Sequence, residues 1–377
     1  MRVAVVTESF LPQVNGVSNT VRHVVDRLRA TGHEPLVVAP GPGSDSYRGI
    51  PVVRVRSVGL PGYRSFPLGL PDPVVQRVLT EFRPDVVHLA SPIVLGAVGL
   101  RAARRLGVPT VAVYQTDVGG FARQYGLYAE SAVSRWVGRL HRRATRTLVP
   151  SKASYRQLGA LGVTDMHIWG RGVSLDLFGP DRRDEALREH WTGHVSASER
   201  PAVIGYVGRL APEKRLHRLT ELADLPGVQL VVVGDGPERG RLERLLPEAR
   251  FTGQLQGADL ARTFASLDIF VHTGESETFC QTVQEAQASG VAVVAPAAGG
   301  PLDLIEHGRT GLLFDVKAPG SLRRHVLDLV DHPDVRRDLA ATALDRVAHR
   351  TWSHLVDELV RTHYGAVLVG PAVDVAA

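Results

Sequence analysis

The sequence predicts an α/β protein built from two tandem Rossmann-like, doubly wound domains that face a central cleft. Three observations support this expectation. The chain has 377 residues, which is more than one hydrophobic core usually organises. Short apolar runs alternate with helical patterns from the N-terminus onward, as in chains that form parallel sheets. This alternation fades around residue 170 and then restarts, which predicts a second domain.

The first domain, residues 1–169, opens with a βαβ unit. Apolar runs at 2–6 and 35–39 have the length of buried strands, and the stretch 18–32 between them has one apolar helical face, formed by Val21, Val24, Val25 and Leu28. Further strands are expected at 85–90, 109–114 and 146–151. Helical stretches separate these strands, so the domain should contain a doubly wound parallel sheet.

The second domain, residues 170–350, repeats the pattern. Its strands are expected at 202–208, 228–234, 268–272, 291–296 and 311–314. A last amphipathic helix is expected over about 351–368 and is available to pack back on the first domain. Doubly wound sheets bind ligands beyond the carboxyl ends of their strands, so the chemistry should lie where the strands of both domains end.

Composition restricts the compartment and the partners. The single Cys280 excludes a disulfide framework and a cysteine-based zinc site. No apolar run approaches the roughly 18 to 20 residues that span a bilayer, so a cytoplasmic protein is expected. The net charge of +5 comes from arginine almost alone, because Lys152, Lys214 and Lys317 are the only lysines. Surplus arginine favours phosphates or phospholipid headgroups, while the lack of a basic and aromatic motif argues against nucleic acid.

Two glutamates, Glu277 and Glu285, flank a stretch that has no other charge. Glu277 follows the expected strand 268–272, and Glu285 lies inside a helix expected from about Phe279 to Ser289. At the helical rise of 1.5 Å, eight residues separate the two carboxylates by about 12 Å at most. Glycosidase carboxylates lie roughly 5 to 9.5 Å apart, so this pair is better suited to holding two ends of a long ligand. Alternatively, Glu277 only complements the helix dipole and Glu285 is solvated.

The start of that helix and a neighbouring turn together predict an anion site. The backbone N–H groups of Thr278, Phe279 and Cys280 would be free to bind a phosphate. The stretch 205–216 supplies two cations, Arg209 and Lys214, after another expected strand. Fixed cations beside a diphosphate stabilise the charge that develops when it leaves. Taken alone, the two cations are equally typical of a charged surface.

Turns that contain glycine follow strands in both domains. The stretch 231–238 places Gly234 after a strand, and 7–20 occupies the first βα turn, where glycine lets a backbone approach a phosphate. The G-x-G-x-x-G fingerprint and its acidic partner are absent, which argues against a dinucleotide-dependent dehydrogenase. No Asp-x-Asp pair occurs either, so we do not expect a metal clamp on a diphosphate.

Six stretches of the chain together resemble one family. They are NGV (15–17), GRGVSLDLF (170–178), GRLAPEK (208–214), VGDGP (233–237), FTGQL (251–255) and ESETFCQTVQEA (275–286). Over nearly its full length, the chain resembles a GT-B glycosyltransferase of family 4. Through TESFLPQVNGVSNTV (7–21) and YQTDVGGFARQYG (114–126), it is most similar to the GDP-mannose-dependent α-mannosyltransferases of phosphatidylinositol mannoside and lipoglycan synthesis.

The resemblance implies a retaining transfer of mannose from GDP-mannose to a lipid-linked or glycan hydroxyl, without a metal or other cofactor. It implies that Arg209 and Lys214 contact the donor diphosphate, Glu277 the sugar hydroxyls and Glu285 the ribose. Asp117 joins Arg209, Lys214 and Glu277 among the catalytic candidates. The other residues expected at the donor are Asn15, Gly16, Gly208, Gly234, Gly253, Thr278, Phe279 and Cys280, with Gly16 meeting the phosphate from the first domain.

Two positions depart from the family's usual pattern. Gln115 stands where many members have a histidine near the sugar, and Asp117, two positions on, is a candidate to share that role. Arg171 replaces the usual asparagine of the motif at 170–178. On the acceptor side, the resemblance and the composition of the surrounding stretches make Gln115 and Tyr63 the candidates.

A basic amphipathic helix is expected over 132–146. One face carries Val133, Trp136, Val137, Leu140 and Ala144, while the rest carries Arg135, Arg139, Arg142, Arg143 and Arg146. Such a helix either lies on anionic lipid, here the inner face of the plasma membrane, or packs its apolar face on the sheet. The loop 58–73, with Tyr63 and Phe66, is a second candidate for contact with lipid or acceptor.

Two other functions share this outline. A UDP- or ADP-sugar-dependent transferase of the same fold would carry the same motifs, because such clefts recognise the base largely by backbone and local shape. A non-catalytic, two-lobed sugar-binding protein would share the architecture. That protein should carry a secretion signal and lack the cationic pair Arg209 and Lys214, whereas this chain shows the reverse.

Overall fold

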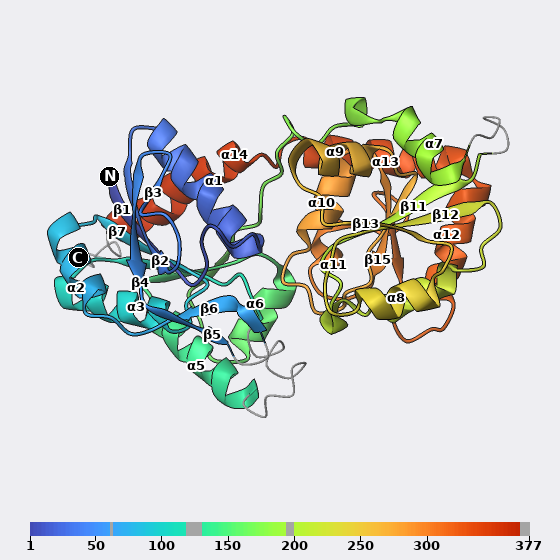
Figure 1. Ribbon diagram of the computed structural model, residues 1–377. Coiled ribbons are helices and arrows are strands. Elements are labelled where there is room, and N and C mark those ends of the chain that lie inside the picture. Colours follow the sequence, from blue (N-terminus) through green and yellow to red (C-terminus); the bar gives the residue numbers. More distant parts are fainter. Residues whose placement is uncertain (61–62, 118–129, 194–199, 370–377) are drawn as a thin grey trace. The chain divides into compact units, whose positions relative to one another are not determined.

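The chain forms two compact units in a computed structural model, which describes residues 1–60, 63–117, 130–193 and 200–369 (Figure 1). Unit 1 comprises Met1–Arg171 together with Trp352–Ala377, and unit 2 comprises Gly172–Thr351. Unit 2 is thus inserted between two parts of unit 1. The chain leaves and re-enters unit 1 through neighbouring segments, because the Val173 N–H donates to the Arg350 carbonyl at 2.9 Å.

Unit 1 is built on an eight-stranded sheet of order β10-β9-β8-β7-β1-β2-β4-β3. The strands are β1 (Arg2–Thr7), β2 (Glu34–Pro40), β3 (Ser46–Tyr47), β4 (Ile50–Val55), β7 (Val86–Ala90), β8 (Thr110–Val113), β9 (Arg146–Val149) and β10 (Met166–Ile168). Only β3 runs antiparallel to its neighbour, and β1 is flanked in parallel by β2 and β7. The expected doubly wound parallel sheet is confirmed, since helices cover both faces of continuous apolar strands.

Helices of unit 1 take their positions from apolar stripes that the sequence displays. They are α1 (Gly16–Ala30), α2 (Val74–Phe82), α3 (Leu95–Leu106), α5 (Glu130–Arg143), α6 (Lys152–Gly159), α14 (Trp352–Glu358) and α15 (Gly365–Val369). The four residues expected on the buried face of the first helix, Val21, Val24, Val25 and Leu28, are all fully buried in α1. Asn15 caps this helix in a capping box with Ser18.

The C-terminal segment completes the core of unit 1. Tyr364 is fully buried, and its hydroxyl lies 2.7 Å from Nδ1 of the equally buried His88 on β7. Arg27 on α1 donates two hydrogen bonds to Asp357, at 2.8 and 2.6 Å, so α14 lies beside α1 (Figure 1). The helix expected over about 351–368 is confirmed, because residues 352–369 are helical throughout, with a π-helical stretch, Leu359–Tyr364, between α14 and α15.

Unit 2 has a six-stranded, fully parallel sheet of order β13-β12-β11-β14-β15-β16. Its strands are β11 (Ala202–Val207), β12 (Val228–Val233), β13 (Arg250–Gly253), β14 (Ile269–Val271), β15 (Ala292–Pro296) and β16 (Leu312–Phe314). Its helices are α7 (Glu185–Thr192), α8 (Arg239–Leu245), α9 (Gly257–Ala265), α10 (Gln281–Ala288), α11 (Pro301–Leu304), α12 (Ser321–Asp331) and α13 (Pro333–Val347). The second expected sheet is therefore confirmed.

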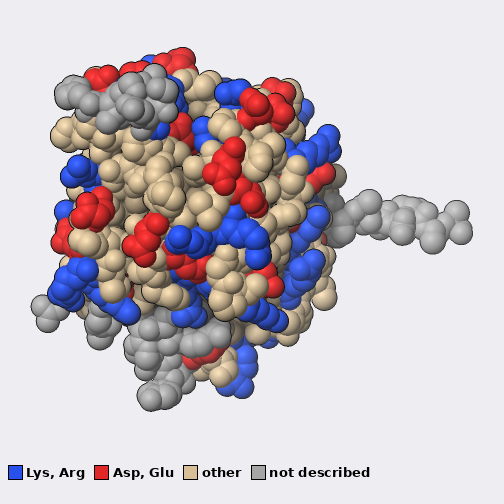
Figure 2. Space-filling model, turned by 90° about the vertical axis from the view of Figure 1, so that its right-hand side faces the viewer, with Lys and Arg blue, Asp and Glu red and all other residues tan. Residues whose placement is uncertain are grey.

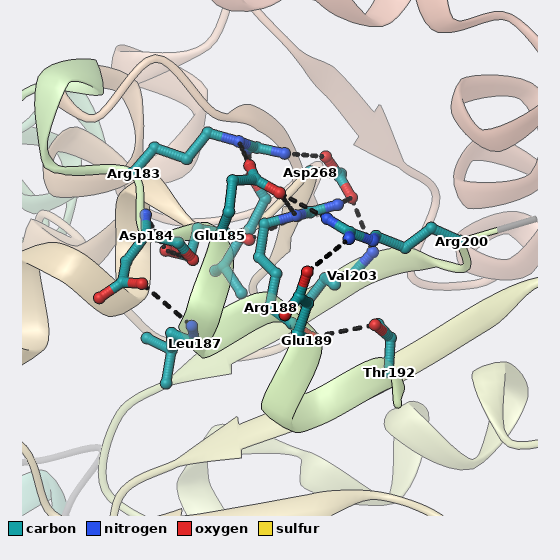
Figure 3. A network of polar contacts seen from close by, with 12 residues as sticks. Arg183, Asp184, Glu185, Leu187, Arg188, Glu189, Thr192, Arg200, Val203 and Asp268 are labelled. Atoms are coloured by element: carbon teal, nitrogen blue, oxygen red, sulfur yellow. Dashed lines mark hydrogen bonds and ion pairs between the residues drawn. The ribbon is translucent and has the colours of Figure 1, made fainter. Parts of the chain in front are cut away.

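A network of arginines and carboxylates holds the amino edge of the unit 2 sheet (Figure 3). Asp268, directly before β14, accepts hydrogen bonds from Arg188 at 2.9 Å and from Arg183 at 3.2 Å. It also accepts the backbone N–H of Val203 on β11 at 2.8 Å. Arg188 belongs to α7 and is buried, so one carboxylate joins a helix to two strands. This network lies at the edge opposite to the one where ligands of such sheets bind.

Charged side chains on the surface commonly pair with one another. On the face shown in Figure 2, acidic and basic side chains lie interspersed among the residues drawn in colour. On α8, for example, Arg239 contacts Glu243 at 2.8 Å, and elsewhere Arg346 contacts Glu306 at 3.1 Å. Exposed pairs of this kind each stabilise the fold by about 0 to 1 kcal/mol.

Three expectations about local structure need correction. The segment expected as a loop, 58–73, contains an antiparallel hairpin of β5 (Ser57–Leu60) and β6 (Tyr63–Gly69). The basic helix α5 ends at Arg143, and Arg146 is instead the first residue of β9. Trp136 lies only at the margin of the apolar face, 36% exposed, with its indole N–H donating to the Ile93 carbonyl.

Candidate active site

The candidate site lies at the carboxyl edge of the unit 2 sheet. β11 and β14 are neighbours there, but the chain continues from β11 to β12 on one side and from β14 to β15 on the other. Crevices form at such reversals of strand order, and ligands of doubly wound sheets bind there. The turn after β11 contains Gly208 to Lys214, and the turn after β14 contains His272 to Cys280.

Glu277 is held between two basic side chains. Its Oε1 atom lies 2.5 Å from Lys214 Nζ and 3.3 Å from His272 Nε2. Burial by itself would raise the pKa of Glu277, but the charges of Lys214 and His272 outweigh burial and hold that pKa well below its usual range. Burial would likewise lower the pKa of Lys214, and Glu277 raises it instead. The pair is therefore an ionised carboxylate and ammonium in a largely buried setting.

Three expected donor-site glycines pack against one another behind this pair. The Gly208 N–H donates to the Val233 carbonyl at 3.0 Å, and the Gly234 N–H donates to the Gly253 carbonyl at 2.8 Å. Gly234 has a φ of 136°, and a Cβ there would stand 1.9 Å from the Gly208 carbonyl oxygen. Any side chain at residue 234 would thus separate the turns that follow β11 and β12.

Arg209 belongs to the same turn but contacts a different carboxylate. Its guanidinium pairs with Glu213, four residues on, and its side chain is 31% exposed. The structure therefore brings Lys214 to Glu277, while the other expected cation is paired within its own turn. The Arg209 side chain is thus partly exposed and is engaged by a carboxylate of its own turn.

The segment before α10 differs from the expected helix start. The helix begins at Gln281, and Cys280 before it has a φ of 81°, a left-handed conformation that cannot continue into the preceding residues as a helix. Thr278, Phe279 and Cys280 thus precede the helix, with the Phe279 and Cys280 side chains buried. The Gly300 N–H donates to the Glu277 carbonyl at 2.8 Å, which anchors this segment on a neighbouring loop.

Glu285 lies on α10 and is partly buried. Burial raises the pKa of its carboxyl to about 8, although a hydrogen bond with Gln281, one turn earlier on the helix, opposes that rise. Glu277 and Glu285 thus differ in electrostatic setting, because one has two basic partners and the other has none among the described residues. A carboxyl that is easily protonated suits hydrogen bonding to neutral hydroxyls better than contact with a phosphate.

In unit 1, Asn15 and Gly16 lie at the start of α1. The Asn15 Oδ1 atom accepts the N–H groups of Val17 and Ser18, each at 3.0 Å, so the side chain of Asn15 is a helix cap. A Cβ on Gly16 would stand 2.7 Å from Nη1 of Arg171. Glycine at residue 16 therefore lets an arginine guanidinium approach the N-terminus of this helix.

Gln115 and Asp117 follow β8 in unit 1. Gln115 is buried, and its backbone carbonyl accepts a hydrogen bond from Arg171 at 3.3 Å. The Tyr114 hydroxyl lies 3.5 Å from Asp117 Oδ1, and both residues line a cavity of about 210 Å³. Residues 118–126 of the motif that begins at Tyr114 lie outside the described residues, as does the side chain of Tyr63.

Sequence reasoning missed His272 and Gly274. His272 is the first residue after β14, at the carboxyl end of the central strands, and that placement was the available signal. Gly274 leaves room for the site, because a Cβ there would stand 2.9 Å from Glu277 Oε1. Within the described ranges, no three His, Cys, Asp or Glu side chains are arranged to hold a metal ion.

Comparison with known proteins identifies the class of this fold and site. A model of Glycosyltransferase Family 4 matches residues 14–177, and a model of glycosyl transferases group 1 matches residues 188–346. Among solved structures, Anabaena HepE in complex with UDP has the same fold, with a TM-score of 0.80 at 21% identity over 97% of this chain and all of HepE. The chain is thus a glycosyltransferase with two Rossmann-like domains, of the GT-B fold.

Its relatives identify the family. A protein from Mycolicibacterium smegmatis named GDP-mannose-dependent alpha-mannosyltransferase is 52% identical over 376 residues, which cover 98% of each chain. A protein of the same name from Corynebacterium glutamicum is 44% identical and covers 100% of this chain and 94% of its own. This chain belongs to glycosyltransferase family 4.

Proposed function

We propose that this enzyme transfers mannose from GDP-mannose, with retention and without a metal, to a hydroxyl of a lipid-linked or glycan acceptor. The observation that carries the proposal is the partly buried ion pair of Lys214 and Glu277 at the carboxyl edge of the unit 2 sheet. The near full-length identity to proteins named GDP-mannose-dependent alpha-mannosyltransferases supports the choice of donor.

In this proposal, the residues of unit 2 divide the work along the donor. Lys214 and Arg209 contact the diphosphate and stabilise the charge that develops on it as the glycosidic bond breaks. Glu277 binds hydroxyls of the sugar, and its ionised state suits a transition state in which positive charge develops on the sugar ring. Glu285 binds the ribose hydroxyls, where no charge develops during the reaction.

The proposal needs no metal ion, because fixed cations perform the task that a metal performs elsewhere. Metal-dependent transfer requires carboxylates that hold the ion beside the diphosphate. The two residues expected to contact the diphosphate are both basic, and each pairs with a carboxylate. Arg209 pairs with Glu213 of its own turn, and Lys214 pairs with Glu277 of the turn after β14. In this proposal, the two negatively charged phosphates of the donor bind to Arg209 and Lys214, either in place of the carboxylates or beside them, without an added cation.

A second candidate is transfer from a UDP-sugar, because the solved HepE structure of the same fold contains UDP. Thermal unfolding with GDP, UDP and ADP separates the two. A ligand at 100 times its dissociation constant stabilises by about 2.7 kcal/mol, so the cognate nucleotide should raise the melting temperature clearly above the others. Transfer assays with GDP-mannose, UDP-glucose and UDP-galactose should then give product with GDP-mannose alone. Stabilisation by UDP and turnover of a UDP-sugar would favour the second candidate.

We propose further that α5 brings the enzyme to an anionic membrane. Arg135, Arg139, Arg142 and Arg143 are exposed on α5, while Val137 and Leu140 pack its other face into unit 1. No helix among the described residues has both the length and the apolar composition that crossing a bilayer requires. Contact would therefore be electrostatic, through headgroups rather than through the acyl core.

Co-sedimentation with vesicles tests this membrane contact. Binding to vesicles that contain anionic lipid should weaken as salt rises, since screening acts beyond about 8 Å at physiological ionic strength. Replacing Arg139, Arg142 and Arg143 with glutamine should weaken binding. The matched control replaces three exposed arginines of unit 2, Arg241, Arg309 and Arg337, and should leave binding unchanged. Equal loss in both triple variants would indicate attraction by net charge rather than by α5.

A further inference from the structure

His272 is a buried histidine at the carboxyl end of β14, only 2% exposed. Its ring stacks roughly parallel to the ring of Tyr206 on the neighbouring β11, with centroids 6.5 Å apart. Its Nε2 atom lies 3.3 Å from Oε1 of Glu277, which follows five residues later in the same turn. The ring is thus fixed between a strand and the carboxylate proposed to bind the donor sugar.

Lys214 and His272 approach the same oxygen of Glu277. Lys214 Nζ lies 2.5 Å from Oε1, and the imidazole lies against that same atom. The second oxygen, Oε2, has no protein partner in the described part of the chain and is not enclosed. Lys214 donates a hydrogen bond to this oxygen, whereas His272 makes an ion-pair contact with it, since no hydrogen bond to the buried Nε2 is formed within the described residues. A carboxylate held at one oxygen by two basic groups presents its other oxygen in a fixed direction, where a ligand hydroxyl can donate to it.

The groups around His272 favour its charged form. Burial alone would lower the pKa of this imidazole, but contacts with Cys280 and Glu277 outweigh burial and raise the pKa to about 9. The Tyr206 ring stacks on this imidazole, and Lys214 contacts the same Glu277 oxygen. The other ionisable groups around Lys214 and Tyr206 are Glu213 and Arg209 from the turn after β11. The positive charges of the imidazolium and Lys214 thus lie beside the negative charge of Glu277, and Glu213 adds a second negative charge next to Lys214.

Gly274 shows that this arrangement is closely packed. A Cβ at residue 274 would stand 2.9 Å from Glu277 Oε1 and 3.0 Å from His272 Nε2. A side chain there would therefore push the imidazole and the carboxylate apart. Glycine at this position is compatible with direct contact between the two groups, and nearly any other residue would disturb it.

We propose that His272 is a positioning residue of the donor site, whose imidazolium holds Oε1 of Glu277 together with Lys214 so that Oε2 faces the donor sugar. This inference rests on the proposed role of Glu277 at the donor. The competing interpretation is that His272 is a neutral core histidine, like His88 and His141, whose pKa values burial lowers to about 4 and about 3. These three buried histidines then differ in charge at neutral pH.

Nuclear magnetic resonance of the full chain, with ¹⁵N-labelled histidine, tests the charge directly. The resonances of His272 are assigned by their loss in His272→Gln. At pH 7.5, His272 should be doubly protonated and should titrate near pH 9, while His88 and His141 should be neutral throughout. In Glu277→Gln, the midpoint of His272 should move down by about one pH unit or more, because one charged partner is lost. A neutral His272 at pH 7.5 overturns the inference, whatever the donor proves to be.

Steady-state kinetics with GDP-mannose tests the positioning. His272→Gln should lower kcat by about tenfold or more and change KM less, because Glu277 acts on the sugar as it reacts. In wild-type enzyme, kcat should fall as pH rises through about 9, and His272→Gln should lack that limb. Gly274→Ala, which leaves the charge in place, should lower kcat in the same direction.

A double-mutant cycle shows whether His272 acts through Glu277. The double variant His272→Gln/Glu277→Gln should be no slower than Glu277→Gln alone, since the group to be positioned has already lost its charge. Fully additive losses, with unchanged melting temperatures, overturn the positioning role. If Glu277→Gln keeps wild-type turnover while the His272 resonance shows a charged ring, the proposed role of Glu277 fails and the positioning role fails with it.

Discussion

The Arg171 guanidinium donates a hydrogen bond to the Gln115 backbone carbonyl across 3.3 Å, so the two residues that depart from the usual pattern of the family are in contact. Arg171 also lies against Gly16 at the start of α1. The family resemblance predicts that Gly16 meets a donor phosphate, and an arginine there would add a cation to the partial positive charge of a helix N-terminus. Gln115 and Arg171 thus both change the electrostatics of the same region, beside the N-terminus of α1.

Replacing Arg171 with asparagine, the residue usual at this position, therefore tests a role in donor binding. We expect the KM for GDP-mannose to rise about tenfold, because a hydrogen bond to a charged group contributes roughly 1.5 to 3 kcal/mol. Arg171→Lys keeps the charge and should lie between wild type and Arg171→Asn. Steady-state kinetics decides the matter, and an unchanged KM in both variants would restrict Arg171 to a structural role.

The two glutamates should respond differently to substitution by glutamine. Glu277→Gln should lose mostly kcat, since the carboxylate contributes most as charge develops on the sugar. Glu285→Gln should lose mostly donor affinity. Because burial raises the pKa of Glu285 to about 8, its neutral acid resembles glutamine at pH 6.5, and the KM difference should widen at pH 9, where wild type is ionised. A difference that narrows as pH rises would contradict this assignment.

The two cations should each matter for turnover. Arg209→Ala and Lys214→Ala are expected to lower kcat by roughly 10² to 10³, as for the loss of one preorganised charge-stabilising donor. Arg241→Ala, on α8 of the same unit, removes an exposed arginine and serves as the control. Circular dichroism should show normal folding in all three variants. Turnover near that of Arg241→Ala would mean that Arg209 and Lys214 are only surface charges.

Transfer should persist when divalent metals are removed. We expect unchanged product formation after dialysis against EDTA and assay in excess chelator, because Arg209 and Lys214 supply the positive charge beside the diphosphate. Magnesium and manganese are added back in parallel samples. Restoration of lost activity by either ion would reject the metal-independent mechanism.

The network around Asp268 should affect stability without affecting donor chemistry. Burial alone would raise the pKa of Asp268, but Arg188 and the Val203 N–H outweigh burial and lower it. A carboxyl with a lowered folded-state pKa stabilises the fold above its unfolded pKa of about 3.9 and loses that contribution as pH falls through the folded value. Asp268→Asn should cost up to about 3 to 5 kcal/mol in urea unfolding near neutral pH, because the buried Arg188 keeps only Glu185, at 3.6 Å, as an acidic partner.

Kinetics provides the matched readout for that variant. As pH falls through the lowered folded-state pKa of Asp268, the difference in unfolding free energy between Asp268→Asn and wild type should shrink, since the wild-type carboxyl becomes neutral as well. The KM for GDP-mannose of folded Asp268→Asn should equal that of wild type, because the network lies at the edge of the sheet opposite to the candidate site. If Asp268→Asn instead raised the KM for GDP-mannose and left the free energy of unfolding unchanged, Asp268 would act in donor binding rather than in stability.

Strands were predictable because their signal is local. Runs such as Val3 to Val6 in β1 are apolar at every residue and rich in β-branched valine, which is typical of a strand buried on both faces. The helix start at Gln281 was not predictable, since it depends on a positive φ at Cys280 that non-glycine residues seldom adopt. Arg146 likewise continues the basic pattern of α5 in sequence, whereas pairing of β9 with β8 and β10 places it in the sheet.

Residues of the candidate site were predictable where each stands out by itself in the sequence. Glu277 stands out by charge, and Lys214 by being one of three lysines in the chain. Their contact joins residues 63 positions apart, and only the adjacency of β11 and β14 in the sheet creates it. His272 was missed for the same reason, because a histidine after an apolar run shows no partner in sequence. Pairing of Arg209 with Glu213 depends on a side-chain rotamer, which sequence does not specify.

The insertion of unit 2 between Arg171 and Trp352 has a consequence for biosynthesis. Tyr364, which fills the core of unit 1 beside His88, leaves the ribosome only after all of residues 172–351. Domains generally fold as units during synthesis, with those whose residues are complete folding first. Unit 1, whose first part is synthesised before unit 2, should therefore be the last to complete its core. Truncated nascent chains that stop before Trp352 should protect unit 2 from protease while unit 1 remains open to cleavage.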